Sequence, residues 1–222
     1  MPECEFPAED DSSSQMVTMD RKQHWNHVFE TKVDQDVSWF EALPETSLQL
    51  LEAAGMAADT CVLDVGGGDS RLVDHLAARG MDCLAVLDVS GAALARARSR
   101  LGLRAAIPTW IEADVAGEWT LKAMDIWHDR AVFHFLTSAD DRHRYRLHLL
   151  QTLKLGGSAI VATFALDGPE RCSGLPVQRY SPDTLSAELG PDLAMIDAVP
   201  HIHTTPWGSR QSFVYCRFRR VH

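Results

Sequence analysis

From about residue 60, short apolar runs alternate with longer polar stretches. Short apolar runs predict buried strands, and apolar residues at every third or fourth position predict amphipathic helices. The expected strands are 61–65, 83–87, 106–112, 125–132 and 158–164. The expected helices between them are 70–79, 91–101 and 138–153. This alternation indicates an α/β fold, with a parallel sheet covered by helices on both faces.

Both ends of the chain depart from the alternation. Ala194–Val199 and Ser212–Phe218 are strand-like and are separated only by a turn that contains proline and glycine. They predict a terminal hairpin, so at least one strand runs antiparallel to the others. Before the first strand, helices are expected at 20–30 and 44–54. Residues 1–19 are acidic and serine-rich without Lys or Arg, which predicts a flexible tail.

Size and charge limit the class of protein. A chain of 222 residues with 45% hydrophobic and 23% charged residues is typical of one globular domain. The net charge of −10 argues against nucleic acid as a partner, because phosphate binding needs a basic surface. No apolar run approaches the roughly 20 residues of a membrane span, and the first residues do not resemble a signal peptide. We therefore expect a cytoplasmic protein.

The cysteines point in the same direction. The chain has five, an odd number, without a CxxC pair. This pattern is typical of reduced thiols rather than of a disulfide framework or a zinc knuckle. Cys61 and Cys83 lie in apolar runs and are expected to be small core residues.

Three consecutive glycines in VLDVGGGDSRL, Gly66, Gly67 and Gly68, follow the first predicted strand. Ligands of open α/β sheets bind beyond the carboxyl ends of the strands, where glycine lets the backbone approach them closely. A tight strand-to-helix turn would also explain glycine here. The context therefore has to distinguish a ligand site from a simple turn.

Two carboxylates follow the next strands. Asp88 closes the second strand and is suited to accept both hydroxyls of a ribose, although it could instead cap the helix that begins near Ser90. Asp114 follows the third strand, where it could accept a hydrogen bond from an adenine amino group. Together with the glycines, these residues indicate an adenosine-containing ligand.

The same stretch narrows the choice of ligand. A dinucleotide fingerprint would need glycine at position 71, where Arg71 stands, and the Gly-Lys-Ser/Thr ending of a P-loop is missing. Asp64, two residues before the glycines, instead offers a negative charge to a ligand that ends in an amino acid with a sulfonium centre. That ligand is S-adenosylmethionine.

The ordered segments VLDVGGGDS, AVLDVS, EADV and LKLGGSAIVATF resemble the class I S-adenosylmethionine-dependent methyltransferases over about residues 20–220. The resemblance implies a Rossmann-like, doubly wound and mainly parallel seven-stranded sheet with an antiparallel C-terminal strand. It implies a methyltransferase domain over 20–222, with lid helices in 20–57. It also implies that Gly66 and Gly68 flank the methionine part and that Asp88 holds the ribose. The expected cofactor-binding residues are Trp25, Trp39, Asp64, Gly66, Gly67, Gly68, Asp88, Val89, Asp114 and Val115.

The segment DIWHDRAVFHFL follows in the place where methyltransferases of bases and glutamine carry a Pro-Pro-Tyr-type sequence. Within it, His134 is a candidate general base near neutral pH, with Asp129 as a second candidate catalytic group. The alternatives are a histidine in the first turn of a helix and a structural salt bridge or cap formed by Asp129 and Arg130.

Aromatic residues near the N-terminus and the loop after strand five are expected to enclose the acceptor. Trp25, Phe29, Trp39 and Phe40 could cover the cofactor and pack against its sulfonium, or could only anchor the N-terminal helices. Arg179 in the loop suits a substrate carboxylate. The candidate acceptor-binding residues are Phe40, Arg130, Arg171, Cys172, Arg179 and Tyr180.

His201 and His203 lie on one face of a predicted strand, a spacing that could bind metal. Because two ligands without an identifiable third make a weak site, we expect ordinary surface histidines and no metal.

The sequence thus predicts an S-adenosylmethionine-dependent methyltransferase that acts on a thiol, amine or hydroxyl of a small molecule. No nucleic acid or membrane partner is expected. A protein-lysine methyltransferase is one alternative, which leaves a protein substrate open. A cofactor-binding protein without catalysis is the other.

Overall fold

The computed structural model describes residues 20–222, and the predicted tail at 1–19 lies outside them. Seven strands form one sheet in the order β3-β2-β1-β4-β5-β9-β8. Strands β1 to β5 are parallel, and β9 runs antiparallel between β5 and β8. The strands are β1 (Val62–Val65), β2 (Leu84–Asp88), β3 (Thr109–Glu112), β4 (Met124–Arg130), β5 (Leu153–Phe164), β8 (Leu193–Thr204) and β9 (Arg210–Arg220). The predicted mainly parallel sheet with an antiparallel C-terminal strand is confirmed.

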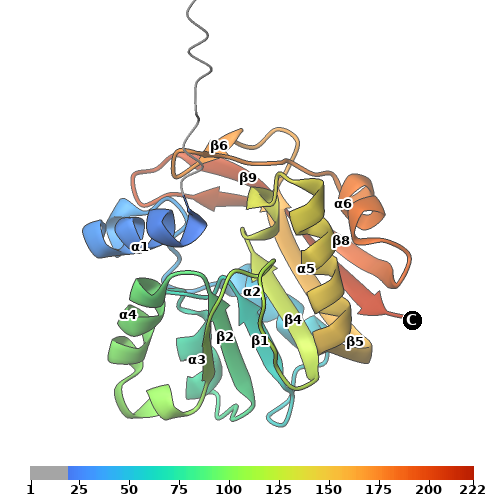
Figure 1. Ribbon diagram of the computed structural model, residues 1–222, viewed down its shortest axis with the longest axis horizontal. Coiled ribbons are helices and arrows are strands. Elements are labelled where there is room, and N and C mark those ends of the chain that lie inside the picture. Colours follow the sequence, from blue (N-terminus) through green and yellow to red (C-terminus); the bar gives the residue numbers. More distant parts are fainter. Residues whose placement is uncertain (1–19) are drawn as a thin grey trace, which may run out of the picture.

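Helices cover both faces of this sheet (Figure 1). They are α1 (Arg21–Thr31), α2 (Glu45–Ala53), α3 (Leu72–Ala78), α4 (Gly91–Leu101), α5 (Ala139–Thr152) and α6 (Pro182–Leu189). Successive residues of β1 point to opposite faces. Leu63 packs in a core with residues of α5 and α6, whereas Val62 packs in a second core with residues of α2, α3 and α4. Burial on both sides explains why the strand sequences read as continuous apolar runs.

Some element boundaries differ from the predicted ones. Strand β3 begins only at Thr109, because residues 102–106 form a 3-10 turn and Pro108 follows it. Strand β5 begins directly after α5 and bulges around Gly156, which has φ +76°. Helix α6 was not anticipated, although Ser181 caps it by accepting from the N–H of Thr184 and Pro182 occupies its first turn.

The cysteine prediction is wrong for one pair. Cys61 and Cys83 are joined by a disulfide, with their Cα atoms 4.6 Å apart. They immediately precede β1 and β2, whose register pairs Val62 with Leu84, so the sheet places the two cysteines side by side. Their spacing in the sequence gives no sign of this. Because disulfides are rare in reducing compartments, the cysteines no longer support a cytoplasmic location.

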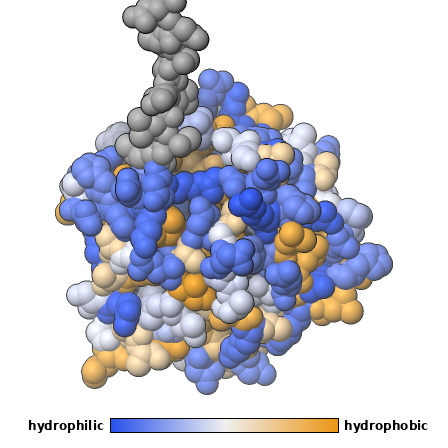
Figure 2. All heavy atoms as spheres, viewed as in Figure 1, coloured by the Kyte–Doolittle hydropathy of each residue, from blue (hydrophilic) through white to orange (hydrophobic). Residues whose placement is uncertain are grey.

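No helix within residues 20–222 has both the length and the apolar character needed to cross a bilayer. Figure 2 shows one face as mainly hydrophilic, with its hydrophobic residues in separate small areas. This face therefore presents no broad apolar patch of the kind that marks a docking interface.

Candidate active site

The glycine turn after β1 has no room for side chains. A Cβ on Gly66, which has φ +65°, would lie 2.0 Å from Cγ2 of Val132. On Gly67 it would lie 2.4 Å from Oδ2 of Asp64, and on Gly68 it would lie 2.5 Å from Oδ2 of Asp88. A side chain at any of these positions would have to displace Val132, Asp64 or Asp88, and the positive φ of Gly66 adds backbone strain. The three glycines thus keep the turn open beside two carboxylates.

A cavity of about 850 Å³, counted with its open mouth, lies against the carboxyl ends of β1, β2 and β4. We call it the main cavity. Most of the predicted cofactor-binding residues line this cavity. Strand ends and the turns after them supply Gly66, Leu87, Asp88, Val89, Ala113, Asp114, Val115, Arg130, Ala131, Val132, Phe135 and Leu136. The N-terminal segment and the C-terminal part supply Arg21, Trp25, Phe29, Trp39, Phe164, Cys172, Gln211 and Phe213.

Asp88 lies at the wall of the main cavity. Its Oδ1 accepts from the N–H of Ser90 at 2.8 Å, while Ser90 itself caps α4 by accepting from the N–H of Ala93 at 3.1 Å. Capping is therefore done by Ser90, and Asp88 is left facing the cavity. Burial raises the pKa of Asp88 to about 7, against the lowering effect of the N–H groups of Ser90 and Gly68.

This pKa predicts a pH-dependent affinity for an adenosine ligand. Ionised Asp88 can accept from two ribose hydroxyls, whereas its protonated form has lost an acceptor site. We expect the affinity for S-adenosylhomocysteine to fall from about pH 8 to about pH 6, by at most about tenfold per pH unit. Calorimetric titrations at these pH values measure it. The Asp88→Asn variant should show weaker binding with a flat pH profile, and an equally steep profile in that variant would contradict the assignment.

Asp64 offers a second polar contact beside the glycine turn. Its Oδ1 lies 2.7 Å from Nδ1 of His128, whose Nε2 lies 2.9 Å from Oγ of Ser47. The other oxygen, Oδ2, is buried and makes no hydrogen bond within residues 20–222. Asp64 lines a second cavity that adjoins the first at Gly66. A buried carboxylate oxygen needs a donor, and the ammonium group of an amino acid ligand would supply one.

The N-terminal segment closes the main cavity with aromatic side chains. Trp25 has its ring 5.6 Å from Trp39 and 5.1 Å from Phe135, both in edge-to-face arrangements. Phe29 lies 6.1 Å from Trp39. All four rings line the cavity.

Helix α1 lies beside α4 (Figure 1), and polar contacts fix it there. Oδ1 of Asn26 accepts from Oγ of Ser90 at 2.8 Å, and Arg96 donates to the carbonyl of Phe29 at 3.0 Å. Arg21 donates to Oδ2 of Asp114 at 3.0 Å and also pairs with Asp141. Asp114 therefore faces the cavity already paired with a cation from α1, so opening the lid would break this ion pair.

The candidate acceptor residues divide into two groups. Phe40 lines the second cavity, Cys172 the main one and Arg130 both. Arg171, Arg179 and Tyr180 line neither. Arg171 is exposed and donates to the carbonyl of Gly174, and Arg179 donates to Glu170 at 2.9 Å. Tyr180 is buried with its ring 5.5 Å from Phe133. We therefore do not assign these three residues to the acceptor site.

The two candidate catalytic groups also lie outside the cavity walls. His134 is fully buried, and its Nδ1 accepts from the N–H of Phe164 at 3.2 Å. Burial, with a contribution from Arg130, lowers the pKa of His134 to about 3. Asp129 accepts from the hydroxyl of Tyr145 at 2.7 Å and from the N–H of Val132 at 2.9 Å. These contacts fit the structural alternatives for both residues, and a general base near neutral pH does not follow from them.

Several residues of the walls were missed. Gln211 and Phe213 lie two positions apart on β9 and share the face that borders the main cavity. The second strand of the predicted hairpin started at Ser212, which left Gln211 outside it. Arg21 was missed because nothing in a single helix shows which neighbour its side chain will reach.

The sheet order and the glycine turn are those of the class I methyltransferase fold. Residues 63–161 match the family model described as a methyltransferase domain. The resemblance to methyltransferases expected from the sequence is thereby confirmed. No curated protein sequence gives a significant match.

Solved structures share the fold over most of the chain. One, from work on the conversion of a disulfide bond into a thioacetal group in echinomycin biosynthesis, has a TM-score of 0.73 at 18% identity and covers 90% of this chain and 91% of its own. The N-methyltransferase NodS from Bradyrhizobium japonicum WM9, in complex with S-adenosylhomocysteine, has a TM-score of 0.68 at 19% identity and covers 89% of this chain and 98% of its own. An S-adenosylmethionine-dependent methyltransferase from Anabaena variabilis has a TM-score of 0.71 at 14% identity and covers 90% of this chain and 93% of its own.

Proposed function

We propose that this protein transfers a methyl group from S-adenosylmethionine to a thiol or amine of a small molecule. The observation that carries the proposal is the glycine turn set between the partner-free Oδ2 of Asp64 and the carboxylate of Asp88. These groups suit two polar parts of the cofactor, the ammonium of its methionine part and the hydroxyls of its ribose. The cofactor supplies an activated methyl group when it is bound.

The covered main cavity supports a small acceptor. Trp25, Phe29 and Trp39 close it, and α1 is fixed to its neighbours by several polar contacts. A macromolecular acceptor would have to displace this lid. Aromatic faces are also suited to lie beside the sulfonium, because its positive charge is attracted to the ring electrons.

The chemistry of the walls favours an acceptor that is already nucleophilic. Beyond Asp88 and Asp114, which suit the cofactor, the titratable groups that line the main cavity within residues 20–222 are Arg21, Arg130 and Cys172. Burial raises the pKa of the Cys172 thiol to about 11, and the guanidinium of Arg130 keeps its proton. Neither side chain is a base at neutral pH. A thiolate or a neutral amine needs no base, whereas an alcohol does, so the hydroxyl acceptors of the initial prediction are set aside.

The wall residues would therefore act mainly by positioning. Holding the acceptor atom in line with the methyl group is worth as much as about 7–11 kcal/mol in favourable cases. Arg130 and Gln211 offer hydrogen-bond donors for the polar part of the acceptor, and Phe213 and Trp39 offer apolar contact.

The test measures transfer of label from S-adenosylmethionine to two kinds of substrate. One is a matched panel of small thiols, amines and phenols, and the other is a protein extract. The proposal expects label in thiols or amines of low molecular weight. Label retained only in precipitated protein would favour the lysine methyltransferase alternative. Tight binding of S-adenosylhomocysteine without turnover of any acceptor would favour a non-catalytic role.

A variant of His134 tests whether the reaction needs a protein base. His134→Asn keeps an acceptor for the N–H of Phe164 and removes the imidazole. We expect kcat/KM to stay within about threefold, with a pH profile that follows the pKa of the acceptor itself. A fall in kcat of about 100-fold or more, at unchanged affinity for the cofactor and unchanged thermal stability, would restore His134 as the base.

A further inference from the structure

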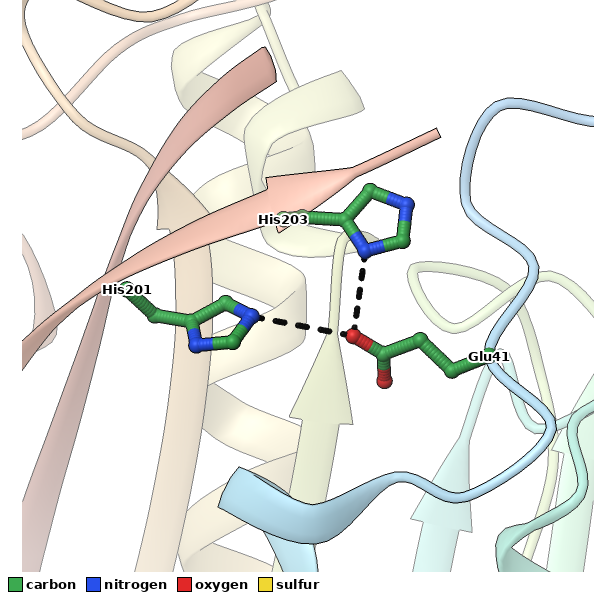
Figure 3. A group of neighbouring side chains, drawn as sticks. All are labelled: Glu41, His201 and His203. Carbon is green, nitrogen blue, oxygen red and sulfur yellow. Dashed lines mark hydrogen bonds and ion pairs between the residues drawn. The ribbon is translucent and has the colours of Figure 1, made fainter. Parts of the chain in front are cut away.

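Three potential metal ligands meet at the edge of the second cavity. Glu41 comes from the segment between α1 and α2, and His201 and His203 come from β8 (Figure 3). Nδ1 of His203 lies 3.2 Å from Oε1 of Glu41, and Nε2 of His201 lies 3.8 Å from the same oxygen. The three candidate ligand atoms all lie within 4.8 Å of one another. Figure 3 shows one nitrogen of each histidine ring pointing toward the carboxylate of Glu41.

The hydrogen bond to Ser38 determines the tautomer of a neutral His203 ring, and therefore which of its nitrogens carries a lone pair. Nε2 lies 2.6 Å from the carbonyl oxygen of Ser38, and a carbonyl only accepts, so Nε2 carries a hydrogen. In the neutral ring, Nδ1 then presents its lone pair to a carboxylate oxygen at 3.2 Å. Two lone pairs at this distance repel each other unless a positive charge lies between them. A proton or a metal ion would provide it.

The surroundings of the His203 ring match those of metal-bound histidines, and His201 has a hydroxyl partner in the same place. Such a histidine usually bonds through its second ring nitrogen to a carbonyl, carboxylate or water, which fixes the ring and its tautomer. His203 makes this contact with Ser38, and Nδ1 of His201 lies 3.1 Å from Oγ1 of Thr46. Two histidines and one carboxylate form a known ligand set for zinc, with a further position open to water.

Arg130 limits which metal fits. Its Nη2 lies 3.0 Å from Oε1 of Glu41, so the carboxylate is already neutralised by a cation. A carboxylate still has acceptor sites on both oxygens. However, a site without excess negative charge is poor for Ca²⁺ or Mg²⁺, which need several oxygen ligands. Imidazole nitrogen instead favours zinc and its neighbours in the first transition series.

We propose that Glu41, His201 and His203 bind a divalent transition-metal ion of the zinc class. Glu41 lies two residues after Trp39, which covers the main cavity, and both histidines belong to the C-terminal hairpin. The ion would tie the covering segment to the sheet. The sequence indicated the two histidines but not the third ligand, because Glu41 is separated from His203 by 162 residues.

Zinc binding to the full chain tests the proposal without any activity measurement. The protein is freed of metal with a chelator and titrated with Zn²⁺ in a calorimeter, and with Co²⁺ while its visible absorption is recorded. His201→Gln is the main variant, because His201 is 28% exposed at its side chain and is tolerant of change. His203→Gln is the second variant. His143→Gln, on the exposed face of α5, is the matched control.

We expect a single ion per chain, with an affinity that falls about tenfold or more in His201→Gln and His203→Gln and is unchanged in His143→Gln. The Co²⁺ spectrum should show the intense bands of a tetrahedral site. The proposal is overturned if both variants bind Zn²⁺ as tightly as the parent chain while keeping its unfolding temperature without metal. It is also overturned if the parent chain binds Zn²⁺ no more tightly than a variant that carries both His201→Gln and His203→Gln.

Discussion

Asp88→Ala is expected to abolish binding of S-adenosylhomocysteine at micromolar concentrations. The variant removes the acceptor for two ribose hydroxyls, and hydrogen bonds to a charged group are worth about 1.5–3 kcal/mol each. The loss should therefore reach about 3 kcal/mol or more, which is about 100-fold or more in affinity. Calorimetry and the shift in melting temperature on adding the ligand measure it.

The stability of this variant serves as an internal control. Because burial raises the folded-state pKa of Asp88 to about 7, its ionised form disfavours folding at and above neutral pH. That cost sets in above the ordinary pKa of an aspartate and is complete above about pH 7, so the alanine variant should be at least as stable as the parent chain at pH 8. Asp82→Ala, an exposed position before β2, should change neither property. Loss of binding together with a lower melting temperature would instead indicate a misfolded turn.

The strands and their carboxyl ends explain why the fold and the cofactor could be predicted from the sequence. Runs such as Val62–Val65 and Leu84–Asp88 are buried on both faces, so each carries its own signal without help from distant residues. Parallel strands also bring their carboxyl ends to one edge, so Asp88 and Asp114 could be assigned to a common site from their order alone. Both line the main cavity.

The acceptor side depends on contacts between distant parts of the chain. Arg130 lines both cavities, but its partners Glu41 and Tyr215 lie 89 and 85 residues away in the sequence. The Cys61–Cys83 disulfide follows from strand register, which no local pattern reports. Arg179 and Tyr180 looked available because loops usually carry function. One forms an ion pair within its loop, and the other enters the core.

The largest stability change is expected for Arg130→Met. The side chain of Arg130 is only 13% exposed and binds the hydroxyl of Tyr215 at 2.9 Å, the carbonyl of Trp39 at 2.9 Å and Glu41 at 3.0 Å. Methionine fills similar space without charge and leaves the Glu41 carboxylate largely buried without its guanidinium. Breaking a buried ion pair in this way costs about 3–5 kcal/mol. Urea unfolding in the presence of a chelator measures the change without any contribution from metal.

The pH dependence and a second variant identify the ion pair as the cause. Burial raises the pKa of Glu41, but its contacts with His203 and Arg130 outweigh burial and hold that pKa below its ordinary value. A lowered pKa contributes stability above the unfolded-state pKa and loses it as pH falls through the folded-state pKa. The deficit of Arg130→Met should therefore be largest near neutral pH and shrink below about pH 4. Adding Glu41→Gln removes the unpaired charge and should recover about 1 kcal/mol or more, since residues in contact are coupled by this amount. If the double variant is less stable than the parent chain by the sum of the two single losses, the two side chains act independently and the ion pair contributes nothing to stability.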